Sequence, residues 1–305
     1  MKYEYFSTFS GIGGFELGIN ERGKCVGYSE IDKYALDVYG RHFPKHTNYG
    51  DITKIEPTSL PNFNLFVGGF PCQSFSIAGK RRGFADTRGT MFFEICRIIG
   101  VKRPKYIVLE NVKGILNHEK GRTFSTIIVS LQELGYDVEW VLLNSKFHGV
   151  PQNRERIFIV ANLGERGRSK ILPYGKSEKT ANEPYKKSVN CIDSNYHRGI
   201  DNHGQRTIIR VNPGEQPQSG IIYSTQGIAP TLSANGGGLG AKTGLYKLTK
   251  DEVRRLTPIE CERLQGFPDD YTAGHSDTQR YKMLGNAVTV NVVKYLFDTL
   301  ETRLL

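Results

Sequence analysis

The chain has 305 residues, 38% of them hydrophobic and 24% charged, which is the balance of a globular protein long enough for two structural units. Its 41 Lys and Arg against 31 Asp and Glu leave a formal net charge of +10, a surplus that favours polyanionic partners. No stretch approaches the ~20 apolar residues of a membrane span, and the first residues lack the basic-then-apolar pattern of a signal peptide.

Five cysteines are dispersed without a C-x-x-C pair: Cys25, Cys72, Cys96, Cys191 and Cys261. An odd and scattered set disfavours both a disulfide framework and a zinc site. We therefore expect a cytoplasmic protein in a reducing compartment, with no bound metal.

The first half of the chain alternates β-rich runs with helical patterns. The predicted strands are 3–9, 24–29, 65–68, 106–110, 138–143 and 156–161. The predicted helices are 31–42, 90–101 and 123–134. Alternation of this kind, with apolar strands, predicts an α/β fold on a mainly parallel, doubly wound sheet.

The alternation weakens after residue 162. Residues 164–220 are rich in Gly, Lys, Arg, Ser, Asn and Pro, and a glycine-dense stretch follows at 236–240. Regular patterns return from residue 249, with helices predicted over 258–265 and 285–300. We expect the middle region to form a smaller, irregular, β-rich and basic unit.

The first predicted strand runs into a glycine turn, Phe9-Ser10-Gly11-Ile12-Gly13-Gly14-Phe15. Glycines directly after a strand permit a tight turn and close approach of a ligand to the backbone. Glu16 takes the place of the third glycine in the G-x-G-x-x-G dinucleotide pattern, which disfavours an NAD site. The alternative for so short a pattern is an ordinary turn between strand and helix.

Two carboxylates follow the glycine turn. Glu30 stands just past the second predicted strand, 19 residues after Gly11, where a carboxylate can accept hydrogen bonds from ribose hydroxyls. Asp51 lies at the expected end of the third strand region, where it could accept from an adenine amino group. Each alone could be a solvated or capping residue. In this order they predict an adenosine-containing cofactor without phosphates, S-adenosylmethionine rather than ATP.

Cys72 follows Pro71 soon after the strand at 65–68, at the carboxyl edge of the sheet, where open α/β folds bind ligands. Pro71 stiffens this turn. Without such a context a cysteine is usually a small buried hydrophobic residue. The segment 76–88 is rich in Gly, Ser and Arg, as suits a loop that follows phosphates.

Glu110 closes another predicted strand at the same sheet edge, and Arg154 and Arg156 lie at the start of the last one. A thiol, a carboxyl group and two guanidinium groups are therefore expected to converge on one face of the molecule.

Taken together, these pieces resemble the bacterial cytosine-C5 DNA methyltransferases, the restriction-modification methylases of the HhaI type. After the glycine turn, the matching pieces occur in the family's order along essentially the whole chain: Pro71-Cys72-Gln73, Glu110-Asn111-Val112, Gln152-Asn153-Arg154-Glu155-Arg156, Arg255-Leu256-Thr257-Pro258-Ile259-Glu260-Cys261, Leu264-Gln265-Gly266-Phe267-Pro268 and Gly285-Asn286-Ala287-Val288.

The resemblance implies a Rossmann-like DNA (cytosine-5-)-methyltransferase, bacterial or phage-encoded, that uses S-adenosylmethionine and releases S-adenosylhomocysteine. In this family the thiolate of Cys72 adds to C6 of a cytosine flipped out of duplex DNA, which makes C5 nucleophilic. Glu110 supplies a proton to N3 and must be protonated at neutral pH, which demands burial or anionic surroundings. Arg156 holds O2 of the base, and Arg154 braces the catalytic loop.

The same resemblance carries ligand contacts over position by position. The expected cofactor residues are Phe9, Gly11, Ile12, Gly13, Gly14, Glu30, Ile31, Asp51, Ile52, Pro71, Asn286 and Ala287. The expected DNA-contacting residues are Ser76, Lys80, Arg81, Arg82, Arg88, Gln218, Thr231, Gly236, Gly237 and Gly238. The expected catalytic and cofactor-binding domain is 1–163, completed by 270–305, and the expected target-recognition domain is 164–269.

One departure from the family pattern concerns the DNA target. Residues 222–238 are very similar to the recognition segment of the HhaI type, yet Ile221 stands where that segment has an arginine that reads guanine. The target sequence therefore stays open, and Gln218 is a candidate to fill the gap left by the flipped base. The expected partners are double-stranded DNA with a short specific site and a restriction endonuclease that acts separately. We expect no membrane association and a monomer.

Three alternatives stay open. The tRNA-cytosine branch of the family uses the same pocket with a Cys-Phe-Thr motif, which we do not find. A catalytically inactive DNA-binding regulator would lack Cys72, Glu110 or the glycine turn, and all are present. A thiol hydrolase would pair Cys72 with His148, whose surroundings show no sign of such a pairing.

Overall fold

The computed structural model describes residues 2–71, 91–164, 172 and 256–304, together with the short strands at 222–224, 229–230, 245–247 and 253–254. The chain forms two compact units. The first unit contains Met1–Leu143, Arg156–Tyr174 and Phe297–Leu305, and the second contains Asn144–Glu155 and Gly175–Leu296. The domain division predicted from the sequence stays a prediction, because most of 164–269 lies outside the described residues.

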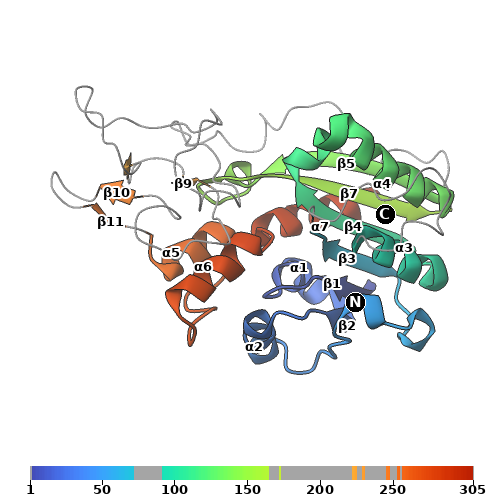
Figure 1. The fold of residues 1–305 in the computed structure, drawn as a ribbon, viewed down its shortest axis with the longest axis horizontal. Helices are drawn as coiled ribbons and strands as arrows, with labels where there is room; N and C mark the ends of the chain where they lie inside the picture. Colours follow the sequence, from blue (N-terminus) through green and yellow to red (C-terminus); the bar gives the residue numbers. More distant parts are fainter. Residues whose placement is uncertain are drawn as a thin grey trace. The chain divides into compact units, whose positions relative to one another are not determined.

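The first unit is built on a six-stranded sheet with the order β2-β1-β3-β4-β7-β5 (Figure 1). Its strands are β1 (Tyr3–Thr8), β2 (Gly23–Ser29), β3 (Leu65–Gly69), β4 (Tyr106–Val112), β5 (Tyr136–Asn144) and β7 (Glu155–Leu163). β1 pairs in parallel with β2 and β3, and β3 pairs in parallel with β4, whereas β7 runs antiparallel to β4. The predicted α/β fold with a mainly parallel sheet is confirmed, and so are all six predicted strands.

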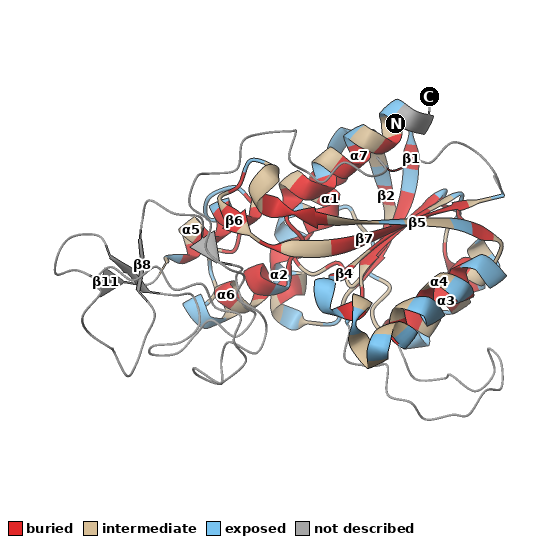
Figure 2. Ribbon diagram, turned by 90° about the horizontal axis from the view of Figure 1, so that it is seen from above, coloured by how far each residue is buried: buried red, intermediate tan, exposed pale blue. Residues whose placement is uncertain are grey.

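Helices pack on both faces of this sheet (Figure 2). They are α1 (Gly14–Ile19), α2 (Lys33–His42), α3 (Met91–Lys102) and α4 (Arg122–Glu133). Short 3-10 turns connect the elements: η1 (Asn20–Arg22), η2 (Ile52–Lys54), η3 (Pro57–Ser59), η5 (Lys113–Leu116) and η6 (His118–Gly121).

Apolar residues along the strands explain how the core forms. Phe6, Phe66 and Ile107 project from neighbouring strands into one apolar cluster with Ile95 of α3 and Ile127 of α4, and all five are fully buried. Apolar strands and the apolar faces of helices therefore bury the same layer from both sides, which is why the sequence pattern locates it.

The end of the chain is fixed to the first unit. The ring of Phe297 packs edge-on against Tyr3 of β1, with ring centroids 5.7 Å apart. Arg22 forms ion pairs with Asp298 and Glu301. Phe297–Leu305 is thus part of the same compact unit as β1.

In the second unit, short strands and helices are described. β6 (Gln152–Asn153) pairs with β9 (Ala229–Pro230), while β11 (Val253–Arg254), β10 (Leu245–Lys247) and β8 (Ile222–Ser224) form a three-stranded sheet in that order. The helical elements are η7 (Ser145–Phe147), α5 (Pro258–Gln265), α6 (Asp277–Asn286) and α7 (Val290–Leu304), of which α7 continues into the first unit.

The helix α5 is the one predicted over 258–265, and local chemistry fixes both of its ends. Thr257 and Glu260 form a reciprocal capping box at its start, next to Pro258 at the first helical position. Gly266 ends the helix in the left-handed conformation, with φ 77°.

The prediction of one helix over 285–300 is wrong at its start. α6 ends at Asn286 and α7 begins at Val290, with Ala287 between them in extended conformation at φ −66° and ψ 148°. The carbonyl oxygens of Gly285 and Ala287 accept hydrogen bonds from Arg154, which stabilises the break. The helical spacing of apolar residues cannot reveal a guanidinium that is distant in sequence.

Candidate active site

The glycine turn after β1 has a left-handed backbone at three positions, with φ 51° at Phe9, 55° at Gly11 and 88° at Gly13. At Gly13 a Cβ atom would lie 2.4 Å from Cε2 of Phe43, so the site accepts only glycine. At Gly11 no atom lies within 4 Å of where a Cβ would stand. The backbone of Gly11 is therefore open to a ligand.

Glu30 ties this turn to the end of β2. Its Oε2 accepts a hydrogen bond from the Gly11 amide at 2.8 Å, and its Oε1 accepts from the amides of Ile31 at 2.7 Å and Asp32 at 2.8 Å. A carboxylate has about four acceptor positions, so capacity for ribose hydroxyls remains. The neighbouring Ile31 is 69% exposed, which offers an apolar surface beside the carboxylate.

Asp51 is placed differently from the prediction, because it caps a turn and does not end a strand. Its Oδ1 accepts from the amide of Thr53 at 3.0 Å and from the hydroxyl of Thr53 at 2.8 Å. These hydrogen bonds lower the pKa of Asp51, so the carboxylate form prevails at neutral pH. Ile52, which begins the turn η2, is buried.

Arg97 on α3 holds the same turn from the side of the core. Its guanidinium donates to the carbonyl oxygen of Ile55 at 2.6 Å and of Ile52 at 2.9 Å, and its Nε donates to Glu94 at 2.7 Å. The helical pattern does not mark this role of Arg97, because a charged residue in an amphipathic helix normally faces solvent. No local signal marks its contact with residues more than forty positions away.

These residues fit an adenosine-containing cofactor without phosphates. The carboxylates of Glu30 and Asp51 suit hydroxyl and amino donors, Ile31 suits the face of a base, and Gly11 leaves its backbone accessible. S-adenosylmethionine presents these groups. Asn286 is exposed at the end of α6 and Ala287 is buried, both in the second unit, and their predicted contact with the cofactor stays a prediction.

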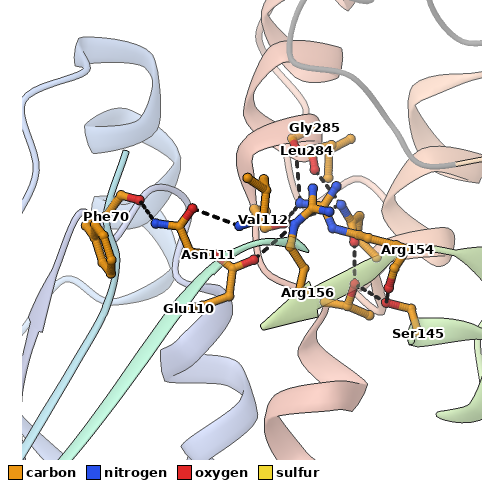
Figure 3. A network of polar contacts seen from close by, with 12 residues as sticks. Phe70, Glu110, Asn111, Val112, Ser145, Arg154, Arg156, Leu284 and Gly285 are labelled. Atoms are coloured by element: carbon orange, nitrogen blue, oxygen red, sulfur yellow. Dashed lines mark hydrogen bonds and ion pairs between the residues drawn. The ribbon is translucent and has the colours of Figure 1, made fainter. Parts of the chain in front are cut away.

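The carboxyl ends of β3 and β4 lie side by side at Gly69 and Glu110, which are paired in register. A Cβ at Gly69 would lie 3.1 Å from Oε2 of Glu110, so the carboxyl group lies close over the neighbouring strand. Asn111 donates from Nδ2 to the carbonyl oxygen of Phe70 at 2.9 Å (Figure 3). The backbone that leads to the exposed Pro71 is therefore fixed to β4.

Asn111 is a second residue whose role the sequence did not reveal. It is 3% exposed, and its Oδ1 accepts from the amide of Val112 at 2.8 Å. The Glu110-Asn111-Val112 motif was visible, yet only Glu110 carried an expected role. The available signal was a polar asparagine directly after a predicted apolar strand, because a buried asparagine is normally hydrogen-bonded.

Glu110 and Arg156 form an ion pair, with Nε of Arg156 3.1 Å from Oε1 of Glu110 and side chains 14% and 12% exposed, respectively (Figure 3). The antiparallel register of β4 and β7 sets Arg156 opposite Val112, two residues along from Glu110. The predicted proximity of carboxyl and guanidinium groups is thus present. Of the two surroundings expected for Glu110, burial or nearby anions, partial burial is present, and the paired group is a guanidinium.

Arg154 lies in the second unit and is 2% exposed. Its Nη2 donates to the carbonyl oxygen of Ala287 at 2.8 Å and of Gly285 at 3.2 Å (Figure 3). Its own carbonyl oxygen accepts from the amide of Ser145 at 3.0 Å. Its expected role of bracing the catalytic loop concerns residues outside the described ranges and stays a prediction.

Other polar side chains of the matching segments serve the interior of the second unit. Gln152 is fully buried and donates to the carbonyl oxygen of Leu264 at 2.8 Å. Gln265 donates to the carbonyl oxygen of Leu284 at 2.7 Å and accepts from the hydroxyl of Thr289 at 2.7 Å. These residues join segments that are far apart in the sequence into one buried network.

Several expected site residues lie outside the described residues. They are Cys72, Ser76, Lys80, Arg81, Arg82, Arg88, Gln218, Thr231, Gly236, Gly237 and Gly238. Within the described ranges, no group of three or more His, Cys, Asp or Glu side chains could hold a metal ion. None of the helices in those ranges combines the length and hydrophobicity needed to cross a bilayer.

The chain is similar to known proteins along nearly its whole length. It matches the family model described as C-5 cytosine-specific DNA methylase over residues 3–302. It is 38% identical over 306 residues to the type II methyltransferase M.HhaI of Haemophilus parahaemolyticus, which covers 96% of this chain and 92% of that protein. It is 42% identical over 301 residues to the type II methyltransferase M1.ScrFI of Lactococcus lactis subsp. cremoris, covering 96% and 76%.

Among solved structures, the Dnmt2 methyltransferase of S. pombe is similar to this chain with a TM-score of 0.71 at 20% identity, covering 99% of each chain. At this identity the likeness concerns the fold alone.

Proposed function

The chain belongs to the family of C-5 cytosine-specific DNA methylases, and from that membership we propose which of its residues bind the cofactor, transfer the methyl group and read the DNA. It is a DNA cytosine-5 methyltransferase that depends on S-adenosylmethionine, as the motifs predicted. The residue assignment rests on the ion pair of Glu110 with Arg156. Next to it, Asn111 donates a hydrogen bond to Phe70, at the sheet edge two residues before Cys72 in the sequence.

The cofactor is proposed to bind along the glycine turn of the first unit. Glu30 accepts from the ribose hydroxyls, Ile31 covers one face of adenine, and Asp51 and Ile52 flank its edge. Phe9, Ile12, Gly14, Pro71, Asn286 and Ala287 are proposed to supply the remaining contacts. When bound, S-adenosylmethionine supplies an electrophilic methyl group on a sulfonium centre and leaves as S-adenosylhomocysteine. We propose that no metal takes part.

The proposed chemistry begins with the thiolate of Cys72, which bonds to C6 of cytosine and makes C5 nucleophilic. After the methyl group has joined C5, solvent water takes the C5 proton, the electron pair of that C–H bond re-forms the C5–C6 double bond, and the C6–S bond breaks to release the thiolate. Each bond to Cys72 that forms is broken again, so the enzyme is regenerated.

Glu110 is proposed to hold the proton at N3 of the base. In the described arrangement its carboxylate is paired with Arg156, so it must take a proton from solvent as the base enters. We propose that O2 of cytosine takes over the hydrogen bonds of Arg156, which removes the stabilisation of the carboxylate and favours its protonated form. Arg154 is proposed to brace the catalytic loop.

The target cytosine is proposed to leave the DNA stack, because its C6 is inaccessible to a thiol in duplex DNA. Residues 76–88, with Ser76, Lys80, Arg81, Arg82 and Arg88, contact the phosphates and cover the flipped base. In the proposed target-recognition domain (164–269), Gln218, Thr231 and the glycines at 236–238 read a short site in double-stranded DNA, with Gln218 filling the vacated position. Ile221 cannot form a bidentate contact with guanine, so the target differs in how it is read from that of the HhaI type.

The relatives named above are type II methyltransferases, and we propose the same setting for this chain: a monomer that protects DNA from a separate restriction endonuclease.

Bisulfite sequencing of duplex DNA incubated with the protein and S-adenosylmethionine tests this function. We expect protection of one cytosine within a short recurring sequence, and none with the Cys72→Ser variant, which should still bind cofactor and DNA. Methylation of tRNA alone would assign the chain to the tRNA branch. Full turnover by Cys72→Ser would exclude the covalent mechanism.

A further inference from the structure

A buried chain of polar groups lies behind the glycine turn. Glu16 on α1 is 2% exposed, and its Oε1 accepts a hydrogen bond from the hydroxyl of Tyr39 on α2 at 3.1 Å. The same hydroxyl oxygen lies 3.0 Å from Nδ1 of the partly buried His46. Carboxyl, hydroxyl and imidazole therefore form one line of hydrogen bonds, and none of the three has a role in the proposed chemistry.

The single proton of the Tyr39 hydroxyl allows two complete arrangements. If Glu16 is a carboxylate, Tyr39 donates to it and Nδ1–H of His46 donates to Tyr39. If Glu16 is protonated, it donates to Tyr39, whose hydroxyl then donates to a bare Nδ1, with the hydrogen of His46 on Nε2. The protonation of Glu16 is thus coupled to the tautomer of His46.

Both ends of this line lead to the glycine turn. Glu16 is in the first turn of α1, which begins at Gly14 directly after the turn. His46 stacks on Phe43, with ring centroids 5.1 Å apart and planes at 13°. Phe43 in turn occupies the space where a Cβ of Gly13 would stand, 2.4 Å from Cε2. A change in the hydrogen-bond line therefore reaches Gly13 from two sides.

We propose that Tyr39 and His46 are positioning residues for the cofactor: through Glu16 and Phe43 they set the glycine turn in one of two hydrogen-bond arrangements, of which the carboxylate arrangement binds S-adenosylmethionine better. This inference rests on the proposed function, which assigns the turn to the cofactor. The carboxylate arrangement is the favoured one because the sulfonium is a cation, and a buried anion in the adjacent helical turn attracts it.

The surroundings make Glu16 the group of this cluster that titrates near neutrality. Burial raises the pKa of Glu16 to about 7, assisted by the charge of Glu30, while hydrogen bonds from Ser7 and Tyr39 lower it. Burial raises the pKa of Cys25 to about 12 and that of Tyr39, Tyr5 and Tyr28 above the usual tyrosine value. Burial lowers the pKa of His46, so its imidazole is neutral at pH 7.

The first test is the tautomer of His46 in the free protein, read from ¹⁵N chemical shifts of its ring between pH 6 and 8. We expect a change from Nε2–H to Nδ1–H with a midpoint near the pKa of Glu16, and its disappearance in Tyr39→Phe. A single tautomer throughout this range in the wild-type protein would overturn the inference without bearing on catalysis.

The second test is calorimetric binding of S-adenosylmethionine over the same pH range. In the wild-type protein we expect the affinity to rise about fivefold, the lower end of typical coupling between sites. Tyr39→Phe removes a hydrogen bond that stabilises the Glu16 carboxylate. Its affinity for S-adenosylmethionine should therefore stay, at every pH, near the value of the wild-type protein at pH 6. His46→Phe keeps an aromatic ring packed on Phe43 but leaves Tyr39 with Glu16 as the acceptor for its hydroxyl proton. Its affinity for S-adenosylmethionine should therefore stay, at every pH, near the value of the wild-type protein at pH 8.

Opposite effects of the two variants distinguish positioning from a merely structural role, which would weaken binding in both. Tyr28→Phe is the matched control, since it removes a hydroxyl from the ring stacked 3.9 Å from Tyr39 and leaves the line intact. The amino group of the cofactor titrates identically in all variants. If the wild-type protein bound no cofactor at any pH, the proposed function would fail. Binding without pH dependence would overturn this inference alone.

Discussion

The side-chain amide of Asn111 donates a hydrogen bond to the carbonyl oxygen of Phe70 at 2.9 Å, across the carboxyl ends of β4 and β3. This bond fixes the backbone at Phe70, two positions before the proposed nucleophile Cys72 in the sequence. The side-chain amide of Asn111 is buried, and its Oδ1 accepts a hydrogen bond from the backbone amide of Val112. These two hydrogen bonds give the side-chain amide one orientation. The bond can therefore position the nucleophile without touching the substrate.

We expect Asn111→Ala to lower kcat about tenfold or more, because a buried hydrogen bond of about 1–3 kcal/mol is lost where the nucleophile must be aligned. Methyl transfer to duplex DNA measures kcat, and calorimetry should give an unchanged Kd for S-adenosylhomocysteine. Asn62→Ala, at an exposed position in the loop before β3, is the control and should retain full activity. Equal kcat in the two variants would remove Asn111 from the site.

The pair of Glu110 and Arg156 gives a second prediction. Glu110→Gln keeps the shape of the side chain but cannot deliver a proton, so kcat should fall about 10²- to 10⁴-fold, the usual contribution of general acid catalysis. The Kd for S-adenosylhomocysteine should be unchanged. Glu119→Gln is the matched control, because Glu119 pairs with Arg122 at 4.0 Å near the surface, where ion pairs contribute little. Activity of Glu110→Gln within tenfold of wild type would argue against a proton at this position.

The sequence could predict the sheet and the meeting of Glu110 with Arg156, because both follow from short-range patterns. Runs of apolar, β-forming residues located the strands, and parallel order places their carboxyl ends at one edge. The Glu110 and Arg156 side chains then meet through the register of β4 and β7.

The remaining features depend on contacts between distant residues, which no local pattern encodes. Asn111 is 41 residues from Phe70, and Arg97 is 45 from Ile52. The break between α6 and α7 depends on Arg154, more than 130 positions away. Asp51 is a local exception: we expected it at the end of a strand, and its hydrogen bonds with Thr53, two residues on, place it instead at the start of a turn.

Arg97 gives a third prediction, on the turn proposed to hold adenine. Arg97→Met retains the volume and helix propensity of the side chain but removes the donors to Ile52 and Ile55. We expect the Kd for S-adenosylhomocysteine to rise about tenfold, equivalent to about 1.4 kcal/mol, with DNA affinity unchanged. Arg41→Met, on the exposed face of α2, should leave both affinities unchanged. Parallel loss of cofactor and DNA binding in Arg97→Met would indicate general unfolding instead.

The fourth prediction concerns two glycines whose replacement by alanine should change the free energy of unfolding in opposite directions. Gly13→Ala places a Cβ against Phe43 at a residue with φ 88°, so both strain and a clash should destabilise the fold and abolish cofactor binding. Gly40→Ala lies in α2, where no atom is within 4 Å of the new Cβ, and should stabilise the protein by about 0.5–1 kcal/mol. Urea unfolding measures both changes. A Gly13→Ala variant with wild-type stability and cofactor affinity would contradict the assigned conformation of the turn.

The buried carboxyl of Glu16 predicts how stability depends on pH. Its pKa rises from an ordinary 4.5 to about 7 in the folded protein because burial disfavours the charged form. The folded state therefore binds more protons than the unfolded chain in that window. The stability that Glu16 contributes is fully present below pH 4.5 and is lost as the pH rises through about 7. The loss amounts to about 3 kcal/mol, the two pKa values being about 2.5 apart.

Glu16→Gln removes this titration, so the difference in unfolding free energy between wild type and variant should shift by about 3 kcal/mol in favour of the variant from pH 5 to pH 8. His46 acts in the opposite direction, since burial lowers its pKa and its contribution to stability grows as the pH rises toward 6.5. Because His46 is present in both proteins, the comparison separates the two groups. Urea unfolding at several pH values measures the difference, and parallel curves for the two proteins would mean that Glu16 is already ionised at pH 5 in the folded state.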